Sequence, residues 1–124
     1  MSVSDQTRGG SPLATVSNGI VQLLRETYGR GPTKAKSYLN DDVVLVVLED
    51  ILTTVEKTLL DDGKEALIRE VRLTYQAAES NRFKSIVEDA LGRRVLTYHS
   101  QVTFNPDMAF EIFVLESQAG SHRS

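Results

Sequence analysis

Cysteine and tryptophan are both absent from this sequence. Without cysteine, the chain has no disulfide, no zinc–thiolate site and no thiol nucleophile. Basic character is also missing, because 14 lysines and arginines stand against 17 acidic residues and give a net charge of −3. Proteins that bind nucleic acid without sequence preference typically present a basic surface, so we expect no nucleic-acid partner.

Long apolar runs are absent as well, and no stretch approaches the ~18 residues that a membrane span requires. Residues 1–11 are polar and rich in glycine and serine, without the apolar centre of a signal peptide. Residues 117–124 have a similar composition. We therefore expect two disordered tails around a single domain at residues 12–116, located in the cytoplasm.

The first apolar pattern predicts a helix over residues 12–28. Pro12 suits the first helical turn, where its missing N–H would have no intrahelical partner anyway. Apolar side chains then recur every three or four residues, which is typical of a helix with one buried face. Gly29 is a favourable residue at the end of this helix because glycine adopts positive φ easily.

Two β-hairpins are predicted, one on each side of a central helical region. Residues 34–39 and 43–49 form the first, with Asn and Asp in the turn between them. Residues 94–104 and 109–116 form the second, with a turn at residues 105–108. In strand 94–104, alternation would place Leu96 on the same face as Tyr98, Ser100 and Val102, with Val95 on the other face.

The central region predicts two helical stretches. Thr53 followed by Glu56 is the pattern of a capping box, which predicts a short helix over residues 54–60. Residues 64–91 predict a longer helix, which would reach ~42 Å if unbroken, more than the width of a small domain. We therefore expect a bend or a break near Asn81, with Asn81 as a new N-cap.

The predicted order is α-β-β-α-α-β-β, an α+β fold with a four-stranded antiparallel sheet built from the two hairpins and with helices packed on it. Residues 43–48 are apolar on both faces of their strand. If every helix lay on one face, the other face of this strand and the side of Phe113 and Leu115 would be exposed, which is rare on a monomer. We expect that either helix 12–28 or a second copy of the chain, in a homodimer, covers this face.

His99 is the only histidine within the predicted domain, and it lies in the middle of a strand. A histidine there could act as a general base or as a proton-linked switch. Strand histidines are more often hydrogen-bonded structural residues, and His99 has no cysteine or nearby carboxylate on its face to complete a metal site. We predict no metal site and no cofactor, and an enzyme with His99 as its base is the weakest of three hypotheses.

The junction at residues 28–34 contains two glycines, a proline and two cations. Backbone amides freed by Gly31, together with Arg30, Lys34 and Lys36, could bind a phosphate or a carboxylate. The spacing matches neither a P-loop nor a dinucleotide-binding fingerprint. The same residues suit a helix end followed by a basic edge strand, where lysines discourage pairing between sheets. Both interpretations stay open.

Residues in three segments give the chain a resemblance to the MpsC-like (YbcI-type) family of small bacterial proteins. They are Tyr28-Gly29-Arg30-Gly31-Pro32, Leu52-Thr53 with Glu56 and Leu59-Leu60, and Val95 through His99-Ser100. The resemblance covers about residues 14–115. It implies association with a membrane-potential-generating system, in which a membrane subunit similar to a proton-pumping dehydrogenase subunit works with a large soluble partner linked to inorganic-carbon uptake. It carries no established active site.

These observations predict a non-enzymatic accessory or interaction module that is a homodimer and docks onto a membrane-associated pump subunit or its soluble partner. The absence of a convergent set of titratable groups in the sequence supports this hypothesis. The alternative is a regulatory domain that binds a small anion or ligand. In that case Arg30, Gly31, Lys34 and Lys36 would surround the ligand, and His99 is a further candidate.

Overall fold

The computed structural model describes residues 11–118, which form four helices and four strands. Along the chain these are α2 (Pro12–Tyr28), β1 (Lys34–Asn40), β2 (Val43–Glu49), α3 (Thr54–Asp61), α4 (Glu65–Ala78), α5 (Ser80–Leu91), β3 (Val95–Phe104) and β4 (Asp107–Leu115). The α+β fold predicted from the sequence is confirmed, with one helix more than expected. The predicted tails at residues 1–11 and 117–124 lie almost wholly outside the described residues.

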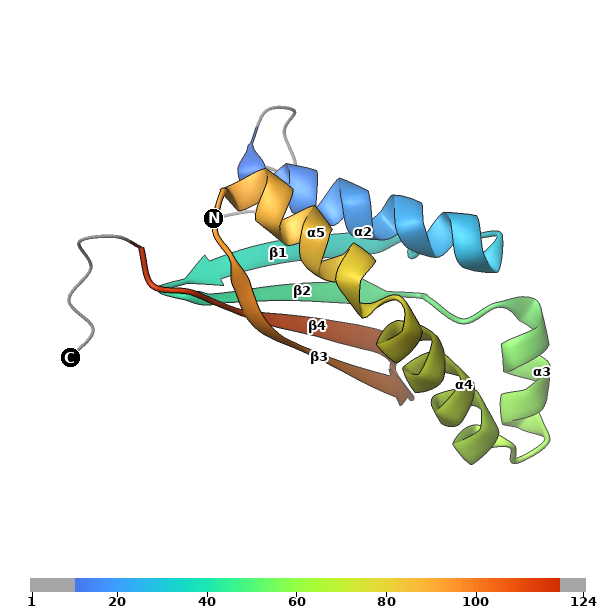
Figure 1. The fold of residues 1–124 in the computed structure, drawn as a ribbon. Helices are drawn as coiled ribbons and strands as arrows, with labels where there is room; N and C mark the ends of the chain where they lie inside the picture. Colours follow the sequence, from blue (N-terminus) through green and yellow to red (C-terminus); the bar gives the residue numbers. More distant parts are fainter. Residues whose placement is uncertain (1–10, 119–124) are drawn as a thin grey trace.

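The four strands form one antiparallel sheet in the order β1-β2-β4-β3. The two hairpins therefore join through β2 and β4, and β1 and β3 are the edge strands (Figure 1). The two central strands are also the two that are apolar on both faces.

Helices α2, α4 and α5 lie on the same face of the sheet (Figure 1). Ser17 of α2 forms a buried hydrogen bond of 2.6 Å with Ser37 of β1. Ile20 of α2 and Phe83 of α5 are fully buried in the same apolar cluster as Val46 of β2. Helix α2 therefore does not cross over, and the interpretation that it covers the second face is wrong.

Strand β4 shows the difference between the two faces directly. Its buried residues are Ala109, Glu111, Phe113 and Leu115, and the half-buried residues between them are Met108, Phe110, Ile112 and Val114. The expectation that the side of Phe113 and Leu115 would be exposed is wrong, because this side lies under the helices. The alternation itself is as expected for a strand with one covered face.

The ends of α2 follow the sequence signals. The Ser11 hydroxyl accepts a hydrogen bond of 3.3 Å from the backbone N–H of Ala14, and Gly29 ends the helix with φ of 81°. Along the helix, Gly19 allows α5 to approach closely, since a Cβ at this position would lie 2.7 Å from Cγ2 of Ile86. These features fix α2 against both the sheet and α5.

The long helical stretch breaks at Glu79, which separates α4 from α5 with φ of −102° and ψ of 17°. The expected N-cap at Asn81 is wrong, because α5 already begins at Ser80 and has no side-chain cap. The break serves packing. It turns the two halves so that both Gln76 of α4 and Phe83 of α5 are buried on the sheet.

The second hairpin differs from the prediction at both ends. A register shift between Val95 and Thr97 buries Val95 and leaves Leu96 50% exposed, so the predicted face of Leu96 is wrong. At the other end, β4 begins at Asp107, two residues earlier than predicted, and its carboxylate accepts hydrogen bonds from the backbone N–H groups of Ile51 and Leu52. This carboxylate therefore holds the loop between β2 and α3 against the sheet.

Candidate functional site

Arg30 connects the junction after α2 to the loop after β2. Its guanidinium donates a hydrogen bond of 2.7 Å to the carbonyl oxygen of Leu52 and another of 3.0 Å to Oδ2 of Asp50. The hydrogen bond from Arg30 holds the pKa of Asp50 below its usual value. The arginine thus already has an acidic partner within the chain.

The other junction residues that the sequence singled out have separate positions. A Cβ at Gly31 would lie 3.1 Å from Cγ1 and 3.2 Å from the carbonyl oxygen of Val21, so the close packing of the junction against α2 favours glycine here. Lys34 and Lys36 lie together on β1, on the face of the sheet that is turned away from the helices. Lys34 is exposed and Lys36 is half-buried.

His99 lies on the same helix-free face but at the opposite edge, on β3. It is exposed, and its Nε2 lies 3.0 Å from the hydroxyl oxygen of Thr97. Because β2 and β4 separate the two edge strands, the sheet does not bring His99 next to Lys34 or Lys36. The five predicted residues therefore do not converge on one point.

The helix-free surface of the sheet, which we call the open face, is apolar along the two central strands and mostly polar along the edge strands β1 and β3. Its apolar side chains are Tyr38, Val43, Leu45, Val47, Met108, Phe110, Ile112 and Val114. Across the central strands, Leu45 lies opposite Ile112 and Val47 lies opposite Phe110. Together with Tyr38 of β1, which lies opposite Leu45, these pairs make the apolar surface continuous over three strands. Sequence reasoning predicted its existence from β2 but misassigned the face of β4.

Beneath the helices, a buried ion pair joins α3 to α4. Arg72, which is 1% exposed, donates hydrogen bonds of 2.7 and 2.5 Å to the two carboxylate oxygens of Glu56 and one of 3.0 Å to the carbonyl oxygen of Ile51. Its guanidinium also lies 3.8 Å from the ring centre of Tyr28. Burial alone would raise the pKa of Glu56, but hydrogen bonds from Arg72 and Thr53 lower it below its usual value.

A second carboxylate, Glu111, is fully buried in the middle of β4. The Tyr98 hydroxyl donates a hydrogen bond of 2.6 Å to its Oε1, and the Gln76 amide donates one of 3.3 Å to its Oε2. Burial raises the pKa of Glu111 to about 7, although its neighbours, including the Tyr98 hydroxyl, partly oppose this. The positive charge of Arg72 also lowers the pKa of Glu111, but the hydrogen bonds of this arginine go to Glu56.

A pocket of about 380 Å³ lies between helices α4 and α5 and strand β3, and Glu111 is not among its lining residues. Gln76, Tyr98 and Ser100 line it and also surround the carboxylate. The sequence analysis missed this group. Glu111 shares its alternate positions with Ala109 and Phe113, but both sets of alternate positions in β4 are apolar. Alternation alone therefore did not show that this acidic residue is buried.

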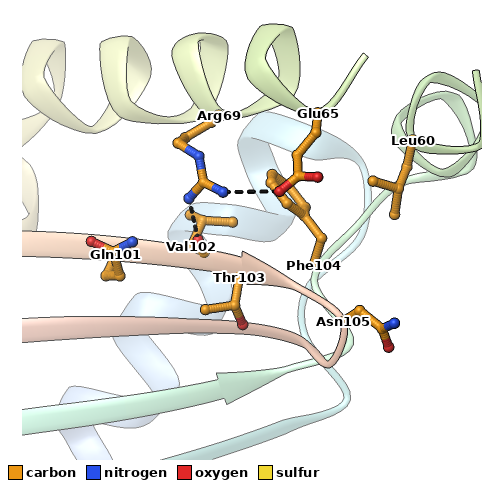
Figure 2. A pocket seen from close by; sticks show the side chains of 8 residues that line it. All are labelled: Leu60, Glu65, Arg69, Gln101, Val102, Thr103, Phe104 and Asn105. Carbon is orange, nitrogen blue, oxygen red and sulfur yellow. Dashed lines mark hydrogen bonds and ion pairs between the residues drawn. The ribbon is translucent and has the colours of Figure 1, made fainter. Parts of the chain in front are cut away.

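A larger hollow of about 640 Å³ lies between the start of α4 and the end of β3 (Figure 2). Arg69 crosses it, donating hydrogen bonds of 3.2 Å to Glu65 and 2.7 Å to the carbonyl oxygen of Val102, and lies over the Phe104 ring. Figure 2 shows Arg69 reaching down from α4 to the strand. We interpret this arginine as a cover for the free edge of β3, since unpaired edge carbonyls otherwise invite another strand.

Two further features bear on function. Within residues 11–118, no three or more His, Asp or Glu side chains come close enough together to hold a metal ion. In that same range, none of the helices has the length and apolar character needed to cross a bilayer.

The comparisons with known proteins give one match. A family model described as "Na+-translocating membrane potential-generating system (MpsC)" matches residues 10–117. Neither the comparison with curated proteins nor that with solved structures finds a match. The family model covers all the helices and strands described above.

Proposed function

Because the chain belongs to the MpsC family, we propose that it is a non-enzymatic accessory module of a membrane-potential-generating system, acting in the cytoplasm as a homodimer. The family description supports the association with such a system. The role within the system and the dimer are inferred from the surface of the molecule. A membrane-associated pump subunit, or its soluble partner, would then bind the dimer rather than a single chain.

The observation that carries this proposal is the open face. All the helices that pack on the sheet lie on its other side, so the apolar surface of the central strands has no cover within residues 11–118. Removing apolar surface from water is favourable by roughly 25 cal/mol for each Å². A second copy presents the same flat apolar surface, and two such sheets pack face to face at a spacing of about 10 Å.

The contacts of the junction residues favour this proposal over an anion-binding domain. Asp50 and the Leu52 carbonyl already occupy the Arg30 guanidinium, and the packing against Val21 accounts for Gly31. A phosphate would have to displace Asp50 to reach this arginine. The lack of convergence between His99 and the basic residues likewise favours a non-enzymatic role.

The proposal can be tested in cells in which the chromosomal copy is replaced by a variant. Ile112→Glu places a charge at the centre of the open face, opposite Leu45. We expect membrane potential, measured with a voltage-sensitive dye, to fall to the level of a deletion strain. Val55→Glu is the matched control, because Val55 is a 69% exposed apolar residue on α3, away from the sheet. Normal membrane potential with Ile112→Glu, at normal protein level, would contradict the proposal.

A further inference from the structure

Strand β3 is the longest of the four strands and lies at an edge of the sheet, yet it contains no lysine, arginine, aspartate or glutamate. The other edge strand, β1, has two lysines among its seven residues. Charged side chains on an edge strand discourage pairing with a further strand, whereas a long uncharged edge favours it. Of the two edges, β3 is therefore the one suited to receive another strand.

The backbone of β3 has hydrogen-bonding groups on its free side. At the start of β4, the Asp107 carbonyl oxygen accepts a hydrogen bond of 3.0 Å from the N–H of Asp50, so Asp107 and every second residue after it face β2. The residues between them face β3 and pair with alternate residues of that strand. The remaining β3 residues direct their N–H and C=O groups away from β4; they are Tyr98, Ser100, Val102 and Phe104. Arg69 reaches the Val102 carbonyl oxygen, which agrees with this direction.

Helix α4 and the free edge of β3 form the two walls of a groove. The hollow of about 640 Å³ lies along residues 101–105, and the pocket of about 380 Å³ lies along residues 98–100. Each has an apolar part, made by Leu60 and Phe104 in the first and by Leu73 and Ala77 in the second. The two hollows follow consecutive residues of one strand, so we treat them as one groove beside the edge.

Arg69 lies in this groove, one turn of α4 before Leu73, and closes the edge. Val102, whose carbonyl oxygen it binds, is fully buried, so the arginine has to move before a strand can pair there. Its ion pair with Glu65 is open to water, since the two side chains are 36% and 56% exposed. Figure 2 shows this pair at the mouth of the hollow. Exposed pairs of this kind contribute little stability, so an incoming carboxylate can replace Glu65 and draw the guanidinium off the edge.

We propose that an extended segment of a partner protein adds to β3 as a fifth strand in this groove, with an acidic side chain at Arg69 and apolar side chains two residues before and after it. Alternate side chains of a strand face the same side, so all three would point toward α4. Main-chain hydrogen bonds then supply affinity, and the apolar parts of the groove with Arg69 supply specificity. A second copy of the chain fits less well, because its own β3 edge has α4 alongside. The groove goes beyond the proposed function, since it does not involve the open face.

Calorimetric titration of the full chain with a synthetic strand tests the recognition of the acidic residue. The probe is acetyl-Thr-Val-Thr-Glu-Thr-Val-Thr-amide, and its control has glutamine in place of glutamate. The glutamate peptide should bind about tenfold more tightly, because only it forms a charge-assisted hydrogen bond with Arg69. In Arg69→Gln the two peptides should bind equally. No binding of either peptide up to about 1 mM, or a preference that survives Arg69→Gln, would overturn the proposal.

A pair of variants on α4 tests the location of the groove. Leu73→Glu places a charge on its apolar wall and should abolish binding of the peptide. Val71→Glu is the matched control and should bind normally, because Val71 is 51% exposed on the same helix and lines neither hollow. Equal binding by the two variants would contradict the proposal.

Two further measurements separate this groove from contacts between copies of the chain. Ile112→Glu should bind the peptide as the wild type does, so a failure of the dimer and a failure of the groove give different results. If the free edge of β3 instead pairs with a second copy, removing the cover in Arg69→Gln would increase the sedimenting mass above that of the wild type. A larger assembly of this kind that binds neither peptide would overturn the proposal.

Discussion

Both faces of the sheet have apolar residues along the central strands, but only one of them also buries ionisable groups. The covered face buries Phe113 and Val46 together with ionisable groups, Glu111 within the sheet and the Glu56–Arg72 pair above it. The open face has apolar residues along the same strands and, at its edges, Lys36 and His99. Apolar content alone therefore does not tell which face of such a sheet is the core.

This difference shows that the packing of the helices, rather than the composition of the strands, determines which face of the sheet becomes the core. On the covered face, polar side chains contact other elements, as Arg72 of α4 does with Glu56 of α3 and with the Tyr28 ring of α2. On the open face, the side chains find neighbours only within the sheet. The covered face thus specifies the fold, and the open face is available for a partner.

The largest difference in the free energy of unfolding between the two faces should come from truncating two phenylalanines on β4. Phe113→Ala leaves a cavity under the helices and should reduce the free energy of unfolding by about 4 kcal/mol, whereas Phe110→Ala on the open face should cost the monomer about 1 kcal/mol. Urea denaturation at low protein concentration measures both. Equal losses would mean that the two faces are equally buried and would contradict the distinction.

The next largest loss of stability should follow from breaking the buried ion pair between Arg72 and Glu56. Arg72→Met leaves Glu56 without its partner in the interior and should cost about 3 kcal/mol, since breaking one side of a buried pair strands the other charge. Arg82→Met is the control. Arg82 is 59% exposed in its pairs with Glu26 and Glu79, so its loss should change stability by less than about 1 kcal/mol. Similar effects from the two variants would show that the covered face does not depend on this pair.

The raised pKa of Glu111 predicts that the stability of the protein depends on pH. Its pKa is raised from 4.5 to about 7 in the folded protein, so the folded state holds more protons than the unfolded state between these values. Stability from this group is therefore lost as the pH rises through that window. Glu111→Gln lacks this loss, so its stability relative to the wild type should increase from acid to neutral pH. Chemical denaturation of both proteins between about pH 4.5 and pH 7 measures this difference, and a constant difference across the window would refute the prediction.

The smallest effect concerns the two serines between α2 and β1. Ser37→Ala leaves the buried Ser17 hydroxyl without its partner and should cost about 1 kcal/mol. The double variant Ser17→Ala with Ser37→Ala should recover part of the loss, because no buried hydroxyl remains. Thr97→Ala on the exposed side of β3 serves as the control. A double variant less stable than Ser37→Ala would show that the unpaired Ser17 hydroxyl carries no penalty and would contradict this explanation.

Local signals in the sequence predicted most of the fold. Pro12, Gly29 and the pair Thr53–Glu56 gave helix ends that the structure confirms, because helix ends depend on a few neighbouring residues. The break at Glu79 carries no such signal. It depends on how two helical halves fit one twisted sheet, and a favourable cap at Asn81 was a poor guide to it.

The site could be predicted less well, because its parts come from distant segments. The doubly apolar strand β2 indicated an uncovered face, but the face of β4 depends on a pairing between strands about 65 residues apart, such as Val46 with Glu111. The register shift between Val95 and Thr97 likewise cannot be predicted from the alternation of apolar and polar residues in β3. Gln76 and Glu111 meet only when α4 packs on β4, which no local pattern reports.

The central claim is that the open face joins two copies of the chain, and sedimentation equilibrium tests it most directly. The full chain at micromolar concentration should have about twice the monomer mass of 13.7 kDa, Ile112→Glu should have the monomer mass, and Val55→Glu should remain a dimer. A wild-type chain that sediments as a monomer, or a dimer that survives Ile112→Glu unchanged, would contradict the account.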